Sequence, residues 1–213
     1  DSKRSLNPRC FASGVSRLKR LFVGGSPGNE QLTALVASAL LILLAIEGAT
    51  LLRLTSLLTV HAFVGMLLIP VVALKLASTG WRMLRYYRNG EEYVRRGPPH
   101  VVLRVLVAPV IVLSTLVLFG TGVALLVLGQ TSGTVVGLHK ASFIVWVGAT
   151  GLHVLAHAAR LPSFLRARVP GLALRIALAT GALAAGGLLA VATLPAADHL
   201  QDRATSHVGL DGD

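Results

Sequence analysis

The sequence predicts an all-α membrane protein, a polytopic bundle of five transmembrane helices with its N-terminus inside and its C-terminus outside. Two observations indicate this fold class. Hydrophobic residues make up 54% of the 213 residues and charged residues 14%, and the mean hydropathy is +0.71. Soluble domains carry about 25% charged residues. The hydrophobic residues also gather into stretches of about 20, the length that a helix needs to cross a hydrocarbon core of about 30 Å.

Five stretches have this length, and the breaks between them hold the charges and turn residues expected of loops. They are residues 32–52, 57–77, 101–128, 137–159 and 176–194. The fifth stretch is rich in Ala and Gly, which allow close helix packing. The expected organisation is a basic cytoplasmic tail over residues 1–30, a four-helix bundle over 31–160, a loop and fifth helix over 161–195, and an extracytoplasmic tail over 196–213.

The basic residues orient the predicted bundle, because Lys and Arg accumulate on the cytoplasmic side of a membrane. All but three of the 20 Lys and Arg residues lie in the first tail, in the loops 78–100 and 160–175, or at helix ends on that same side; the exceptions are Arg53, Lys140 and Arg203. The first tail has no long apolar core, so no cleaved signal peptide is expected. We therefore expect a multi-pass protein of the cell (inner) membrane. Its net charge of +11 should contact lipid headgroups rather than nucleic acid.

Four histidines fall inside the predicted helices, where an ionisable side chain usually faces the bundle interior and marks a functional site. His61 lies in the second helix, and His139, His153 and His157 lie in the fourth. His61 and His139 come at nearly the same depth, close to the outer ends of their helices. Two imidazoles on facing helices are typical axial ligands of haem iron. The competing interpretation is a structural membrane subunit whose histidines only form hydrogen bonds.

The spacing of His139 and His153 adds a second argument, because fourteen residues span about 21 Å of helix and bring both rings to one side. This H-x13-H spacing resembles that of the membrane-embedded b-type (di-haem) cytochromes, such as the cytochrome b N-terminal and bacterial cytochrome b electron-transfer families. In these proteins a four-helix bundle holds two haems between its second and fourth helices. The resemblance covers residues 31–160. It implies haem b ligated by His61, His139 and His153, and electron transfer between a membrane quinone or quinol and a redox partner protein.

The second helix departs from the family pattern, since Lys75 stands where a second histidine would follow His61 by fourteen residues. An inner haem on His153 would then need another partner. Lys75 as a neutral amine and His100 at the start of the third helix are the candidates. His157 shares the helix of His153 and cannot reach the opposite face of the ring. A cation that reaches toward the inner membrane surface is the competing role for Lys75.

Other groups near the outer ends of the helices fit a haem there. Arg53 and Lys140 could pair with the haem propionates or simply reach into the headgroups. Glu47, the one carboxylate within a predicted span, could accept a proton from a quinol or bond a neighbouring helix. Several glycines in the same half of the bundle would leave room for a macrocycle; these are Gly48, Gly65, Gly120 and Gly122.

The motifs that the sequence lacks narrow the function. No CxxCH for covalent haem, no HExxH and no Gly-rich phosphate loop are present, and Cys10 is the single cysteine. Electron-transfer cytochrome and oxidoreductase subunit both stay open. The principal rival is a transition-metal transporter or sensor that uses His153, His157 and Glu47. For the last tail, with His199 and His207, we expect disorder, a docking segment or a weak metal site being the alternatives.

Overall fold

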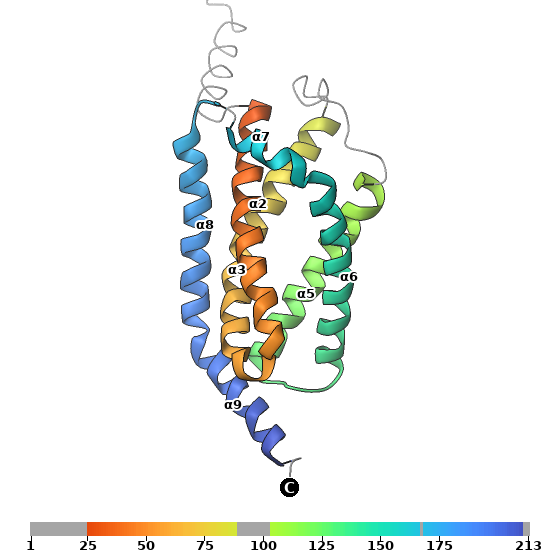
Figure 1. The fold of residues 1–213 in the computed structure, drawn as a ribbon, viewed down its shortest axis with the longest axis vertical. Coiled ribbons are helices and arrows are strands. Elements are labelled where there is room, and N and C mark those ends of the chain that lie inside the picture. The colour runs from red at the N-terminus through yellow and green to blue at the C-terminus, as the bar shows by residue number, and fades with distance from the viewer. Residues whose placement is uncertain (1–24, 89–102, 167, 211–213) are drawn as a thin grey trace, which may run out of the picture.

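The computed structural model describes residues 25–88, 103–166 and 168–210, and all of its regular elements are helices (Figure 1). In chain order they are α2 (Gly25–Thr50), η1 (Leu51–Arg53), α3 (Leu54–Tyr87), η2 (Leu103–Val107), α5 (Ala108–Leu128), α6 (Thr134–His157), η3 (Ala158–Arg160), α7 (Leu161–Arg166), α8 (Leu172–Ala192) and α9 (Leu194–Leu210). The predicted all-α fold is confirmed. The expected basic tail over residues 1–30 lies almost wholly outside the described residues, as does His100.

Four helical stretches within these ranges are long and apolar enough to cross a membrane. They are Gly25–Tyr87, Val105–Leu128, Thr134–His157 and Leu172–Ala192. Their length and composition are typical of helices in lipid and are consistent with the multi-pass membrane protein predicted from hydropathy. The number of five crossings and the orientation of the termini stay predictions.

The first of these stretches is a helical hairpin. The chain turns back at η1, so that α2 and α3 lie side by side (Figure 1). At the end away from this turn, the Asn29 side-chain amide donates to the Ser78 carbonyl at 2.9 Å, and the Thr33 hydroxyl donates to the Ser78 hydroxyl at 3.0 Å. Val36, Leu40 and neighbouring side chains of α3 form a buried core along the rest of the contact.

A second hairpin is formed by α5 and α6. Gly129 ends α5 in the left-handed region with a φ of 62°, a common way for a helix to end, and Gly133 begins the next helix with a φ of 95°. Between the two helices, the buried Trp146 indole donates to the Thr115 hydroxyl at 2.9 Å. The turn of this hairpin and the turn at η1 lie at the same end of the molecule (Figure 1). The residues just inside the two turns are therefore at one level.

α8 packs against α3 on the side away from α6 (Figure 1). The contact is close at Gly186, where an added Cβ would overlap the carbonyl oxygen of Leu67 and lie 3.1 Å from its Cα. Ala190, one turn further along α8, is also buried. The small residues of this helix thus allow the close packing that their composition predicts.

The segment after α8 is helical, so the expectation of disorder for the last tail is wrong over Leu194–Leu210. This helix, α9, packs against the start of α3. There the Gln201 side-chain oxygen accepts from the Thr59 backbone N–H at 3.1 Å, and the Gln201 amide donates to the Thr55 carbonyl. Ala197 and Leu200 are buried in the same contact. The hydropathy of the segment is low, but its apolar residues lie on one face and cover the end of the bundle.

The close approach of α8 to α3 predicts a difference between two adjacent glycines. Gly186→Ala should lower the melting temperature in detergent, since overpacking costs about 1–3 kcal/mol. Gly187→Ala is the matched control, because nothing lies within 4 Å of a Cβ built there. The control should be neutral or slightly stabilising, given the higher helix propensity of Ala. Equal melting temperatures for the two variants would contradict the packing described here.

Candidate functional site

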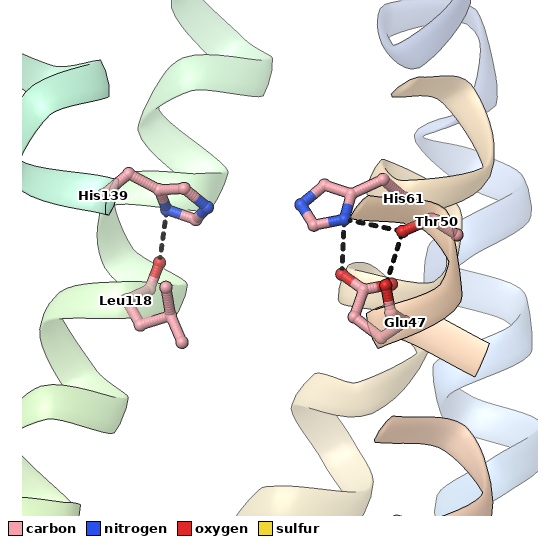
Figure 2. Close-up of polar contacts among 5 residues, drawn as sticks. All are labelled: Glu47, Thr50, His61, Leu118 and His139. Carbon is pink, nitrogen blue, oxygen red and sulfur yellow. Dashed lines mark hydrogen bonds and ion pairs between the residues drawn. The ribbon is translucent and has the colours of Figure 1, made fainter. Parts of the chain in front are cut away.

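The two hairpins bring His61 and His139 face to face. His61 comes from the start of α3 and His139 from the start of α6, and their ring centroids are 6.5 Å apart with the ring planes at 90°. Figure 2 shows that the Nε2 atoms of the two rings point toward each other across the space between the hairpins. The structure thus places together the two histidines that the sequence puts at similar depth on different helices.

The far nitrogen of His61 is held by α2. Its Nδ1 lies 3.0 Å from Oε1 of Glu47 and 3.1 Å from the hydroxyl oxygen of Thr50 (Figure 2). The Thr50 hydroxyl donates its own proton to the Glu47 carbonyl at 2.6 Å. Its oxygen is therefore left to accept from Nδ1. Both neighbours of Nδ1 are acceptors, so the Nδ1 atom of His61 carries the proton.

The far nitrogen of His139 is held in the same way by α5. Its Nδ1 lies 3.1 Å from the Leu118 carbonyl oxygen and 3.0 Å from the Thr121 hydroxyl oxygen. The Thr121 hydroxyl donates to the Val117 carbonyl at 2.7 Å. A carbonyl can only accept, so Nδ1 of His139 is again the protonated nitrogen.

These bonds leave a lone pair on each Nε2, directed into the space between the rings. An imidazole binds a metal through such a lone pair, and a hydrogen bond from its other nitrogen fixes the orientation of the ring. Metal–imidazole bonds are about 2 Å long and a ring nitrogen lies about 1 Å from its ring centroid, so two imidazoles on opposite sides of one metal atom have centroids roughly 6 Å apart. The observed 6.5 Å fits that arrangement.

We call these two residues the outer histidine pair, after the side of the membrane that the sequence predicts for them. Two further residues lie close to the pair. Gly122 lies against His139, because a Cβ built on it would be 3.2 Å from the Cε1 atom of the ring. The second carboxylate oxygen of Glu47, Oε2, is buried and has no hydrogen-bond partner within the described part of the chain. Of the glycines expected to make room, Gly48 and Gly120 have open space instead of a neighbour within 4 Å.

The predicted propionate partners lie at the surface. Arg53 and Lys140 are both exposed, at the ends of the helices that carry the outer histidine pair. Their positions suit either contact with an acidic group of a bound ligand or contact with lipid headgroups. Their role stays a prediction.

The other end of the bundle has a different arrangement. His153 and His157 stack on one another with centroids 4.5 Å apart, and the Nδ1 atom of His157 donates to the His153 carbonyl at 3.0 Å. The Lys75 amine donates to the Thr33 carbonyl of α2 at 2.9 Å. Within the described residues, no imidazole faces His153 from another helix as His61 faces His139. A second haem at this level stays a prediction.

Sequence reasoning missed three groups of the outer site. Thr50 is three residues from Glu47, and Thr121 lies between Gly120 and Gly122, so both could have been assigned to the level of the histidines. Hydroxyl side chains are common in membrane helices, however, and depth alone does not single these two out. The Leu118 carbonyl carries no sequence signal, since every residue has one. Glu47 takes the simpler of its two expected roles and bonds the neighbouring helix through His61.

No protein-family model, no curated protein and no solved structure matches the chain.

The hydrogen bonds predict the tautomers of the two rings. In protein freed of metal and haem, ¹⁵N NMR should show His61 and His139 protonated at Nδ1, because each Nδ1 is surrounded by acceptors. His199 is exposed on α9 and serves as the control, for which we expect the Nε2–H preference of a solvated imidazole. Nε2–H signals from both His61 and His139 would contradict the site geometry.

Proposed function

We propose that the chain is a b-type cytochrome of the cell membrane that binds one haem b between His61 and His139. In this proposal the protein carries electrons between a quinone pool and a redox partner protein. The observation that supports it is the outer histidine pair, whose Nε2 atoms face each other across the gap between the hairpins with the ring centroids 6.5 Å apart. Each ring is held from behind by acceptors on its Nδ1.

The geometry favours haem over a bare metal ion. Transition-metal ions in proteins take four or more ligands, whereas two opposed imidazoles supply only two. No group of three or more His, Cys, Asp and Glu residues is close enough to hold an ion in the ranges that the structure describes. A porphyrin brings four equatorial nitrogens and leaves two axial positions open. Two facing imidazoles meet that need.

A bound haem would supply a one-electron iron couple. The chain's own part is to hold the iron from both sides and to keep it among apolar helices. If His61 and His139 both held a haem iron, they would leave it no free position for oxygen or substrate. The arrangement therefore favours electron transfer over oxygen chemistry.

The membrane placement of the proposal uses five crossings, by α2, α3, α5, α6 and α8. Basic side chains of α3, including Arg82 and Arg85, lie at the end of the bundle away from the outer histidine pair. By the preference of Lys and Arg for the cytoplasmic side, this end faces inward and the histidine pair lies near the outer face. The many apolar side chains on the outside of the bundle suit contact with lipid and with a lipid-soluble quinone.

The rival metal transporter has less support. It would need Glu47 together with His153 and His157, but Glu47 bonds His61 beside His139. His153 lies fourteen residues further along α6, about 21 Å away. These residues therefore do not form one site. A visible spectrum distinguishes the proposal from a purely structural role for the histidines, because only bound haem gives a Soret band.

The purified protein, made with adequate haem supply, should show a Soret band and a low-spin b-type spectrum that changes on reduction with dithionite. His61→Ala and His139→Ala should each remove most of the haem, because one axial imidazole and its hydrogen bonds are lost. His199→Ala, on the exposed face of α9, should retain it. Lys75→Met should also keep the outer haem, since Lys75 bonds α2 at the other end. Unmodified protein without a Soret band would refute the proposal.

Two glycines of α5 give an independent test of where the haem lies. Gly122→Ala should lower the haem-to-protein ratio or weaken haem retention, because its Cβ would press on the His139 ring at 3.2 Å. Gly120→Ala adds the same methyl group with no neighbour within 4 Å and should keep the unmodified ratio of one. Equal ratios in both variants would show that His139 is not an iron ligand in this position.

A further inference from the structure

The two rings of the outer histidine pair differ in what accepts their Nδ1 protons. On His139 the second acceptor beside a Thr hydroxyl is a neutral backbone carbonyl, that of Leu118 at 3.1 Å. On His61 it is the carboxylate of Glu47, at 3.0 Å. The side chains of His61 and Glu47 are both largely buried, with exposed fractions of 21% and 15%. An acidic group thus lies directly behind one of the two proposed axial ligands.

We propose that Glu47 is a positioning residue that acts through His61 to lower the redox potential of the haem iron. The inference rests on the proposed function, because it needs His61 as an iron ligand. It adds a role for a residue that does not touch the haem.

The physical reason is the charge of the acceptor. A carboxylate that accepts the Nδ1 proton draws it away from the ring, so that Nε2 becomes a stronger electron donor. Stronger donation and a nearby negative charge both favour ferric iron, which carries one more positive charge than ferrous iron. A carbonyl dipole, as on His139, has the same direction of effect but no net charge. The two ligands of one iron are therefore unequal.

The position of Glu47 is fixed by its neighbours. The Thr50 hydroxyl donates to the Glu47 backbone carbonyl at 2.6 Å and its oxygen accepts from His61 at 3.1 Å, which ties the end of α2 to the ring. This link keeps the Glu47 carboxylate in reach of Nδ1. A swing of the side chain into lipid would leave Nδ1 with the hydroxyl alone.

The second oxygen of Glu47 supports a charge role. Oε2 is buried and receives no hydrogen bond from the described residues. A carboxylate left half-satisfied inside a membrane bundle is costly, and a positive charge nearby would offset that cost. The ferric iron beyond His61 would supply such a charge. Among the described residues, the one hydrogen bond to this carboxylate is thus the bond from His61, so little else there offsets its charge.

The effect can be measured as a difference between two affinities. The midpoint potential of a haem protein rises when ferric haem loses more affinity than ferrous haem. Loss of an outer hydrogen-bond partner typically costs ten- to a hundredfold in metal affinity. If Glu47→Gln weakens ferric binding tenfold more than ferrous binding, the potential rises by about 59 mV for a one-electron couple.

The test is a potentiometric titration of the full-length haem-loaded chain. Glu47→Gln keeps an acceptor of similar shape but removes the charge, and it should raise the midpoint potential while the Soret band is retained. Thr121→Val, on the His139 side, should cause a smaller shift because the Leu118 carbonyl still accepts from Nδ1. Ser38→Ala is a control on the same helix as Glu47. Among the described residues the Ser38 hydroxyl bonds only the Ala34 carbonyl, so the midpoint potential of this variant should be unchanged.

An unchanged potential in haem-loaded Glu47→Gln would overturn the inference and leave the cytochrome proposal standing. If Glu47→Gln does not hold haem, Glu47→Asp decides. Its carboxylate is withdrawn from His61 by one methylene, so its potential should rise partway, and an unchanged value would again overturn the inference. Unmodified protein that binds no haem at all refutes the proposed function instead.

Discussion

The outer half of this bundle depends on one requirement, that each imidazole N–H inside a membrane must find an acceptor where no water is present. Both histidines meet it with the same device. A Thr hydroxyl gives its proton to a carbonyl of its own helix and then accepts from Nδ1, as Thr50 does for His61 and Thr121 does for His139. One protonated nitrogen on each ring is thereby fixed. The opposite nitrogen is left with a lone pair that faces the other hairpin.

The fold supplies the facing geometry through two hairpins that turn at the same end. Each hairpin contributes one ring and the acceptors behind it, α3 with α2 and α6 with α5. Neither ring depends on the other hairpin for its orientation. The orientation of each ring is therefore set by contacts within its own hairpin. α8 and α9 then brace α3 from the sides that do not face α6.

Much of the fold could be predicted from the sequence because lipid restricts the solutions to helices long enough to cross it. The apolar stretches predict the long helices, and similar distances from the turns predict that His61 and His139 lie at nearly the same level. The helix α9 could not be predicted in this way, since its mean hydropathy is low and it is held by specific contacts such as that of Gln201 with Thr59. The groups that accept the Nδ1 protons of the two rings could not be predicted from the sequence either. A backbone carbonyl such as that of Leu118 has no signature in the sequence.

The departure of Lys75 from the resembling family has a physical counterpart in how the two ends of the bundle use their polar groups. At the inner end, Lys75 and Thr33 bond each other's helices, and Asn29 and Thr33 both bond Ser78, so these polar groups are satisfied between α2 and α3. At the other end, by the two turns, Glu47 and Thr50 of α2 bond only Nδ1 of His61 on α3 and leave its Nε2 directed at the other hairpin. At the level of Lys75, the polar groups of α2 and α3 thus bond one another. The histidine near the turns keeps Nε2 unbonded by its own hairpin, as the proposed haem ligation requires.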